Sequence, residues 1–203
     1  MAIKAVIFDI GGVLLHSDEH VKAEEWEAQA KLQKGEIFKF ISRSGLGDAA
    51  TRGKISSQEL WSRVSAHFKI DPEQIHEFED EFVASERLNT ELVEFLQSLR
   101  PQYKTAMLSN AWSGVREVLN QKYGLDKLVD VQLFSFEEGT MKPEAKFYQL
   151  ALMRLHVQGY ETVFLDDKLV NVDGASLFGI NSIHYRGNEQ AIADINRILH
   201  PKA

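Results

Sequence analysis

Short runs of apolar residues recur along the chain, and within each run they follow one another without regular polar alternation. The runs are KAVIF (4–8), TAMLSN (105–110), VQLFS (131–135), TVFLDD (162–167) and NSIHY (181–185). Runs of this kind are typical of strands that are buried on both faces of a parallel sheet. The pattern therefore predicts a parallel sheet with both faces covered.

Helical periodicity appears between these runs from residue 90 onward. The segments TELVEFLQSLR (90–100) and PEAKFYQLALMRLH (143–156) each place their apolar residues on one stripe of a helix. Alternating strands and helices are typical of doubly wound domains with right-handed crossovers. We therefore expect an α/β fold, a Rossmann-like parallel sheet core.

Residues 16–87 interrupt this alternation, because they are helical and acidic in pattern and contain no convincing strand. Ser56 and Glu59 form a capping-box pattern, and Asp71 followed by Pro72 indicates another helix start. We therefore expect a core made of residues 1–15 and 88–203. A helical cap, residues 16–87, is inserted after the first strand.

Composition narrows the classes of partner. The 203 residues include 23 Lys+Arg and 30 Asp+Glu, a formal net charge of −7, which disfavours nucleic acid but allows a small anionic ligand. The absence of cysteine excludes disulfides and thiolate metal sites. No apolar stretch is long enough for a membrane span or a signal peptide, so we expect a cytoplasmic protein without membrane contacts. The oligomeric state stays open.

Polar side chains follow the predicted strands. They are Asp9, Ser109, Asn110, Asp166 and Asp167, joined by Lys142 in the loop GTMKPE. Pro143 biases Lys142 toward an extended conformation and suits the first helical turn, which places the lysine in the loop that enters the helix. Ligands of open α/β sheets bind at the carboxyl ends of the strands, so one edge should gather these groups.

This set of groups suits phosphoryl chemistry. Asp9 and one of the paired aspartates could hold Mg²⁺, which prefers oxygen ligands. A carboxylate oxygen of Asp9 could then attack phosphorus and form an aspartyl-phosphate. Ser109, Asn110 and nearby backbone N–H groups would bind phosphate oxygens, while Lys142 would neutralise charge.

Four of these segments together resemble a known family. FDIGGV, LSNA, MKPE and VFLDD resemble the ordered motifs of the haloacid dehalogenase-like superfamily, and the helical insertion resembles the C1-type cap of its capped members. The resemblance covers essentially the whole chain, the core strongly and the cap weakly. With RGKIS and KPEAKFY added, the pattern is most similar to bacterial phosphatases of the α-D-glucose-1-phosphate phosphatase type.

The resemblance implies roles for individual residues. Asp9 would be the nucleophile and a metal ligand, and Ser109 would be a phosphate ligand. Lys142 would neutralise the negative charge that the nucleophile and the phosphate share. By analogy with capped members, Asp167 would bind the metal directly and Asp166 would support it from behind.

The glycines after Asp9 mark a departure from the family. Gly11 and Gly12 allow a sharp turn, so that the backbone carbonyl of Gly11 can face the metal. Most phosphatases of the superfamily have a second aspartate at the position of Gly11, which protonates the leaving group. His16 and Asp18 follow shortly and are candidate replacements. The 2-haloacid dehalogenases also lack that acid, need no metal and attack carbon, but their fourth motif lacks the aspartate pair.

Several of these residues also have structural interpretations. Asp167 could N-cap the helix that follows it, and Asn171 could brace Asp167 or lie on the helix surface. Arg43 and Arg52 lie in or beside a glycine-containing stretch and could reach a substrate.

The sequence therefore predicts a Mg²⁺-dependent phosphatase that acts on a small phosphorylated metabolite, with a sugar phosphate as the first candidate. The alternatives are a metal-free 2-haloacid dehalogenase-like hydrolase and a catalytically weak phosphometabolite-binding protein.

Overall fold

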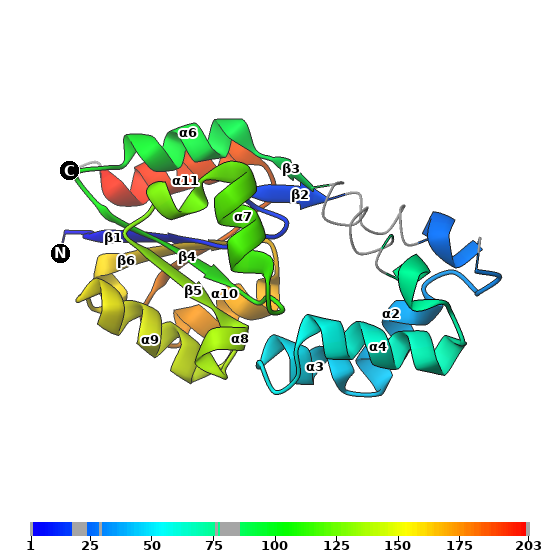
Figure 1. The fold of residues 1–203 in the computed structure, drawn as a ribbon. Helices are drawn as coiled ribbons and strands as arrows, with labels where there is room; N and C mark the ends of the chain where they lie inside the picture. Colours follow the sequence, from blue (N-terminus) through cyan, green and yellow to red (C-terminus); the bar gives the residue numbers. More distant parts are fainter. Residues whose placement is uncertain (1, 18–23, 29, 76, 78–85, 202–203) are drawn as a thin grey trace.

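A parallel sheet forms the centre of the core (Figure 1). The computed structural model describes residues 2–17, 24–28, 30–75, 77 and 86–201. Within them, the sheet has the strand order β5-β4-β1-β6-β7. Its strands are β1 (Ala5–Phe8), β4 (Lys104–Ser109), β5 (Val131–Phe134), β6 (Thr162–Asp166) and β7 (Asn181–His184). Each strand overlaps the apolar run that predicted it, and all pairings are parallel.

Strand β1 lies at the centre of this sheet, paired with β4 on one side and β6 on the other. The chain passes from β1 to β4 and β5, and then crosses over to β6 and β7. The topology therefore reverses at β1, and in open α/β sheets such a reversal creates a crevice outside the carboxyl ends of the strands. Asp9 directly follows β1 at this point.

Helices cover both faces of the sheet, as the apolar runs predicted (Figure 1). Val6 and Phe8 of β1 pack into one buried cluster, and the alternate residues Ala5 and Ile7 pack into a second cluster on the opposite face. The first cluster includes residues of α6 (Thr90–Ser98), α7 (Val115–Tyr123), η1 (Leu125–Lys127) and α11 (Asn188–Leu199). The second includes residues of α9 (Ala145–Leu155) and α10 (Leu169–Ser176). Short helices α8 (Ser135–Glu138) and η2 (Gly159–Glu161) lie in the connections.

The insertion is helical, but short strands stand at both of its ends. Strands β2 (Leu15–Ser17) and β3 (Glu86–Leu88) pair antiparallel, whereas the sequence pattern predicted no strand between residues 16 and 87. A strand of three residues is too short to show a pattern of alternating apolar and polar residues. The two strands pair because the two ends of the insertion lie side by side. The predicted boundaries therefore fall inside this strand pair.

The insertion has a hydrophobic core of its own. Its described helices include α2 (Glu36–Arg43), α3 (Leu46–Thr51) and α4 (Ser57–Phe68). Trp26 and Trp61 are buried in this core, and Phe38 and Phe68 pack against it. These aromatic residues therefore stabilise the insertion by burial.

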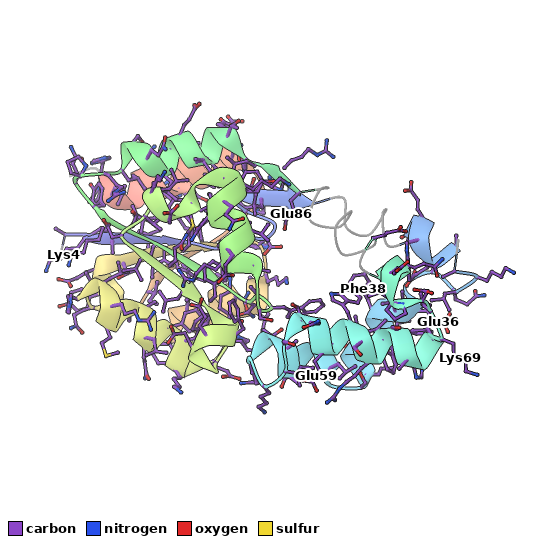
Figure 2. All side chains as sticks on the ribbon, viewed as in Figure 1. Lys4, Glu36, Phe38, Glu59, Lys69 and Glu86 are labelled. Carbon is purple, nitrogen blue, oxygen red and sulfur yellow. The ribbon has the colours of Figure 1, made fainter. Side chains whose placement is uncertain are left out.

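Two of the predicted helix starts in the insertion are present. Ser56 accepts a hydrogen bond from the Glu59 N–H at 3.0 Å, while the Glu59 carboxylate pairs with Arg63 on the exposed face of α4 (Figure 2). Asp71 accepts a hydrogen bond from the Glu73 N–H at 2.8 Å. Among the described residues, no helix is long and apolar enough to cross a membrane.

Candidate active site

The carboxyl ends of β1, β4 and β6 open into a cavity of about 570 Å³. Its lining comprises Asp9, Gly11, Gly12, His16, Ser109, Asn110, Lys142, Asp167, Lys168 and Asn171. Most of the residues that the sequence predicted for a site are therefore gathered around one space, at the edge where the strand order reverses.

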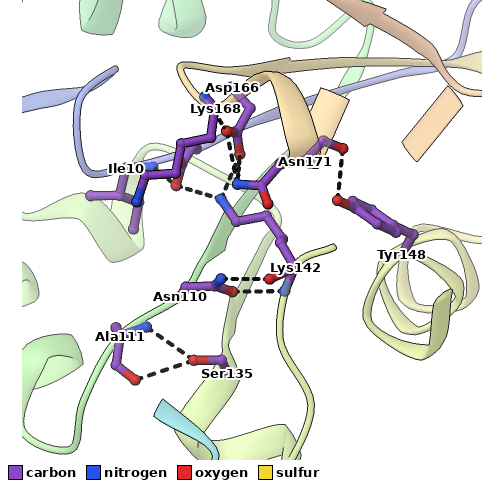
Figure 3. A network of polar contacts seen from close by, with 10 residues as sticks. Ile10, Asn110, Ala111, Ser135, Lys142, Tyr148, Asp166, Lys168 and Asn171 are labelled. Carbon is purple, nitrogen blue, oxygen red and sulfur yellow. Dashed lines mark hydrogen bonds and ion pairs between the residues drawn. The ribbon is translucent and has the colours of Figure 1, made fainter. Parts of the chain in front are cut away.

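Lys142 lies between two buried carboxylates. Its Nζ atom is 2.7 Å from Asp9 Oδ1 and 2.8 Å from Asp166 Oδ2 (Figure 3). Burial tends to lower the pKa of Lys142, but the two carboxylates outweigh it and the net direction is upward. The side chain therefore carries a positive charge at the centre of the site.

Local hydrogen bonds hold the Lys142 loop. Asn110 Nδ2 donates to the Lys142 carbonyl and Asn110 Oδ1 accepts from the Lys142 N–H, each at 2.8 Å (Figure 3). Pro143 precedes the N-cap residue Glu144, so it lies just before α9 and not in its first turn as predicted. The Asn110 side chain thus positions Lys142. Because this side chain is already hydrogen-bonded, the Asn110 backbone N–H would be the group that makes the predicted contact with phosphate.

Asp9 is buried at the end of β1. Its Oδ1 atom accepts a hydrogen bond from the Ile10 N–H at 2.6 Å in addition to its contact with Lys142. Burial raises the pKa of Asp9 to about 7, and the Lys142 ammonium opposes that shift. The carboxylate form of Asp9 therefore depends on nearby positive charge.

The two consecutive aspartates have different environments. Asp166 is fully buried and accepts hydrogen bonds from Lys142, from the Lys168 N–H and from Asn171 (Figure 3). Asp167 Oδ1 is also buried, but it has no hydrogen-bond partner among the described residues. Burial and the neighbouring Asp166 raise the pKa of Asp167. An unpartnered carboxylate oxygen in this position is ready for a cation.

These contacts change two predictions from the sequence. Asn171 braces Asp166 and not Asp167, with Nδ2 2.9 Å from Asp166 Oδ1. The N-cap residue of α10 is Lys168, so Asp167 does not cap this helix. The Asp166 carboxylate instead accepts the N–H of this N-cap residue, Lys168, at 2.8 Å.

The two glycines after Asp9 have different constraints. Gly12 has a φ of +79°, and a Cβ added there would lie 2.5 Å from Asp167 Oδ2. At Gly11 no atom of the described residues lies within 4 Å of an added Cβ, so the described part of the site has room for a side chain at this position. Gly12 therefore permits the close approach of the first loop to Asp167, whereas Gly11 leaves an open space.

His16 also lines the cavity, from strand β2. Its Nε2 atom is 3.3 Å from Asn89 Nδ2, and its ring stacks on Tyr185 with centroids 6.2 Å apart. Asp18, the other candidate proton donor, lies outside the described residues. Of these two candidates, His16 is thus the one that the structure places in the cavity that Asp9 also lines.

The two predicted arginines of the insertion lie away from this lining. Arg43 is exposed at the end of α2, and Arg52 forms ion pairs with Asp48 and Glu144. Neither belongs to the described residues that line the cavity. For Arg52, the ion pair with Glu144 is a contact between the insertion and the core. A contact of either arginine with substrate stays a prediction.

Sequence reasoning missed two positioning residues. His184 Nε2 lies 3.0 Å from the Asp167 carbonyl oxygen, and Asn89 N-caps α6 and contacts the His16 ring. His184 ends β7, so its position at a strand end was an available signal. Asn89 precedes a helix, so the sequence indicates an N-cap at this position. It does not indicate the contact with His16, which lies far away in sequence.

A second cavity, of about 680 Å³, lies at the amino ends of the strands β1, β4 and β5. Lys4, which is labelled in Figure 2, is one of its lining residues. It is lined by several basic residues, whose ion pairs are Lys4–Glu161, Arg100–Asp130 and Arg154–Glu138. Lys104 donates to the Leu155 carbonyl oxygen. These partners largely neutralise the basic groups, so this cavity offers little charge to a ligand.

The carboxylates of the first cavity fit a divalent cation. Asp9, Asp166 and Asp167 each offer an oxygen within 4.8 Å of the others. Hard cations such as Mg²⁺ bind carboxylate oxygens, and Asp167 Oδ1 is a buried oxygen without a described partner. The donor set is therefore suitable for Mg²⁺.

A family model described as "haloacid dehalogenase-like hydrolase" matches residues 3–179. The chain belongs to the haloacid dehalogenase-like hydrolases. The ordered motifs, the reversal at β1 and the buried Lys142–Asp9 pair are thus features of a member of this family.

Curated relatives of this haloacid dehalogenase-like hydrolase differ in length. The sesquiterpene phosphatase astK of Aspergillus oryzae is 26% identical over 97% of this chain and 96% of its own length. D-ribitol-5-phosphate phosphatase of Bacteroides thetaiotaomicron is 22% identical over 84% of this chain and 85% of its own. Mouse acyl-CoA dehydrogenase family member 10 is 29% identical, but the chain spans 19% of its length.

Solved structures share the fold of this hydrolase. A HAD family enzyme from Bacteroides thetaiotaomicron matches with a TM-score of 0.80 at 20% identity, over 94% of this chain and 98% of that one. Its wild-type complex with magnesium and inorganic phosphate matches with a TM-score of 0.76 at 21% identity, over 90% and 94%. A 2-haloacid dehalogenase from Pseudomonas syringae matches with a TM-score of 0.65 at 23% identity, over 90% and 86%.

Proposed function

We propose that this hydrolase is a Mg²⁺-dependent phosphatase that cleaves a small phosphomonoester, with sugar phosphates as the first class to test. The observation that carries the proposal is the buried, unpartnered Asp167 Oδ1 beside the carboxylates of Asp9 and Asp166. The names of two relatives, a sesquiterpene phosphatase and a D-ribitol-5-phosphate phosphatase, support a phosphorylated small molecule as substrate. The neighbouring structure with magnesium and phosphate supports the same chemistry.

In this proposal Asp9 is the nucleophile. A carboxylate oxygen of Asp9 bonds to phosphorus while the bond from phosphorus to the leaving oxygen breaks, which gives an aspartyl-phosphate. Water then attacks phosphorus, releases inorganic phosphate and restores the carboxylate. Lys142, 2.7 Å from Asp9, holds positive charge where negative charge collects on the phosphoryl group.

Other residues bind the phosphoryl group and the metal. The Ser109 hydroxyl and the Asn110 backbone N–H would hold phosphoryl oxygens from the end of β4. Asp9, Asp167 and the Gly11 carbonyl would hold Mg²⁺, and Asp166 would lie behind these ligands. When bound, the ion would supply positive charge to the phosphoryl oxygens.

His16 is the proposed proton donor to the leaving oxygen. It lines the same cavity as Asp9, and Gly11 offers no side chain for this task. An imidazole can both donate and accept a proton through its ring nitrogens, which suits proton transfer.

Dehalogenation is the second candidate function, and Gly11 favours it because a departing halide needs no proton. The fully used hydrogen-bonding capacity of Asp166 beside an unpartnered Asp167 oxygen argues against a metal-free site.

A panel of phosphomonoesters and 2-haloacids, assayed with Mg²⁺ and with EDTA, tests the proposal. We expect phosphate release that requires Mg²⁺ and disappears in D9N. Halide release in EDTA would replace the proposal with dehalogenation. Tight phosphate binding without any turnover would replace it with a binding protein.

A further inference from the structure

The helical insertion rests on the two loops that carry the candidate catalytic groups. Trp112, three residues after Ser109, donates from Nε1 to Thr51 Oγ1 at 3.1 Å and packs edge-on against Trp61, with ring centroids 5.8 Å apart. Trp112 thereby joins the hydrophobic core of the insertion. The loop after β4 is thus anchored in the helices of the insertion.

A second set of contacts surrounds the turn between α3 and α4. The Ser57 N–H donates to Ser113 Oγ at 2.8 Å. Gly53 has a φ of +65°, and a Cβ added there would lie 2.0 Å from the Phe136 carbonyl oxygen. The turn therefore meets the core backbone closely, and the absence of a side chain at Gly53 makes that approach possible.

The loop that carries Lys142 contacts the same turn through an ion pair. The Arg52 guanidinium binds Glu144, which lies two residues after Lys142, and it also binds Asp48 within α3. Glu144 Oε2 accepts a hydrogen bond from Thr140 Oγ1 at 2.7 Å. Arg52 thus holds the side chain of Glu144 from across the boundary, while Thr140 holds it from within the loop.

The two loops are also joined to each other. Asn110 forms two hydrogen bonds with the Lys142 main chain, and the Ala111 N–H donates to Ser135 Oγ at 3.0 Å (Figure 3). Displacement of either loop would therefore move the other. The Lys142 Nζ contacts with Asp9 and Asp166, at 2.7 and 2.8 Å, leave little tolerance for such a movement.

We infer that Arg52 is a positioning residue, which acts through Glu144 to hold Lys142 at its working distance from Asp9. The turn at residues 51–57 braces both loops, so that docking of the insertion sets the geometry of the phosphoryl cradle. This inference rests on the proposed phosphatase function. It also gives Arg52 a role that requires no contact with substrate.

The test compares R52M, E144Q and the double variant R52M/E144Q in the 203-residue chain. R63M is the matched control, because Arg63 pairs with Glu59 inside α4 and has no partner in the core among the described residues. D48N removes the other partner of Arg52 and leaves Glu144 in place. For each protein, kcat and KM on an aryl phosphate, hydrogen exchange of segment 139–145 and urea unfolding are measured.

We expect R52M and E144Q each to lower kcat by roughly tenfold with KM nearly unchanged, because small misplacement of a catalytic group has large effects on rate. The double variant should lose no more than the worse single variant, since both remove one interaction. Exchange of segment 139–145 should accelerate in all three. R63M should match wild type, D48N should lose less than R52M, and R52K should recover part of kcat.

The inference would be overturned if kcat were unchanged in R52M and E144Q. It would also be overturned if the fold-losses in kcat of the two single variants multiplied in the double variant. Equal loss in R63M would overturn it too, because the effect would then be general destabilisation. Hydrogen exchange separates this inference from the proposed function. If wild type hydrolyses no phosphate but R52M still loosens segment 139–145, the function is wrong and the brace is retained. If exchange does not change, the brace is wrong.

Discussion

Lys142 Nζ and Asp9 Oδ1 form a buried ion pair 2.7 Å apart, and the two residues reach it from different strand connections. Asp9 follows β1 directly, whereas Lys142 arrives from the loop between α8 and α9. The lysine also contacts Asp166, so it carries a single positive charge between two carboxylates. We expect both the stability and the chemistry of the site to depend on this charge.

Removal of the lysine should therefore affect both properties. We expect K142M to lower the free energy of unfolding by about 3–5 kcal/mol, because it leaves buried carboxylates without their partner. Phosphatase activity should fall by roughly a hundredfold or more. Urea unfolding and steady-state kinetics measure the two effects. K146M is the control, since Lys146 is exposed on α9, and a comparable loss there would contradict a specific role for Lys142.

The two aspartates of β6 should respond differently to the same substitution. D167N removes a charge without breaking a described hydrogen bond, so folding should be retained while Mg²⁺ affinity falls. D166N disturbs the contacts with Lys142, Lys168 and Asn171 and should be clearly destabilising. Calorimetric titration with Mg²⁺ and urea unfolding measure these outcomes. Full Mg²⁺ affinity in D167N would show that Asp167 is not a ligand.

Position 11 offers a gain-of-function experiment. Because an added Cβ at Gly11 meets no atom within 4 Å, G11D should fold and place a carboxyl group near the leaving oxygen. We expect the rate on alkyl phosphates to rise by roughly tenfold or more, since general acids accelerate such steps. G11A is the control for the side chain itself. An equal gain in G11A, or no gain in G11D, would contradict this reading.

The neighbouring glycine should not tolerate substitution. G12A introduces a Cβ at a φ of +79° and 2.5 Å from Asp167 Oδ2. The backbone strain alone should cost about 1–2 kcal/mol of unfolding free energy, and the displaced Asp167 should weaken Mg²⁺ binding. Thermal unfolding and Mg²⁺ titration measure both. A stable G12A protein with wild-type affinity would show that the loop can move without consequence.

His16 should matter most for poor leaving groups. We expect H16N to lower activity on alkyl phosphates while activity on aryl phosphates, whose leaving oxygen is more acidic, changes little. H200N, near the end of the chain, controls for loss of a remote histidine. Rates on a series of leaving groups make the measurement. Equal losses across the series would assign His16 a structural role together with Asn89 and Tyr185.

Acid should weaken the Arg52–Glu144 pair. Arg52 lowers the pKa of Glu144 to about 2 from an ordinary value of 4.5. A carboxyl group with a lowered folded-state pKa contributes stability above its unfolded pKa, and this contribution is lost as the pH falls from about 4.5 toward about 2. The stability difference between wild type and E144Q should therefore shrink over this window and in high salt, because the pair is partly exposed. A difference that is independent of pH would contradict the assignment.

Much of the core could be predicted from local pattern. Apolar runs without regular polar alternation predicted all five strands of the sheet, because strands that are covered on both faces lack an exposed polar face. The polar residues at the ends of these runs then marked the cavity, since parallel strands end at the same edge. The strand pair β2–β3 escaped prediction because three residues carry no periodicity.

Partner assignments inside the site were harder. The sequence left Asn171 either beside Asp167 or on the helix surface, but in the structure its side-chain amide donates to Asp166. It also offered Arg52 as a side chain that could reach a substrate, but it gave no sign that packing of the insertion brings that guanidinium to Glu144. Spacing along a helix gives the face on which a residue lies, but not which of two adjacent carboxylates it meets.

The sequence by itself determined the α/β architecture, the ordered acidic, hydroxyl and lysine motifs, and the missing acid at Gly11. These depend on residue type and local periodicity, which the chain carries wherever it folds. Only the tertiary structure decided that, among the described residues, Asp166 is hydrogen-bonded while Asp167 Oδ1 is buried without a partner, that His16 lines the cavity, and that Arg52 pairs with Glu144. Those relationships join residues distant in sequence, so they are fixed by how the layers pack and not by any local pattern.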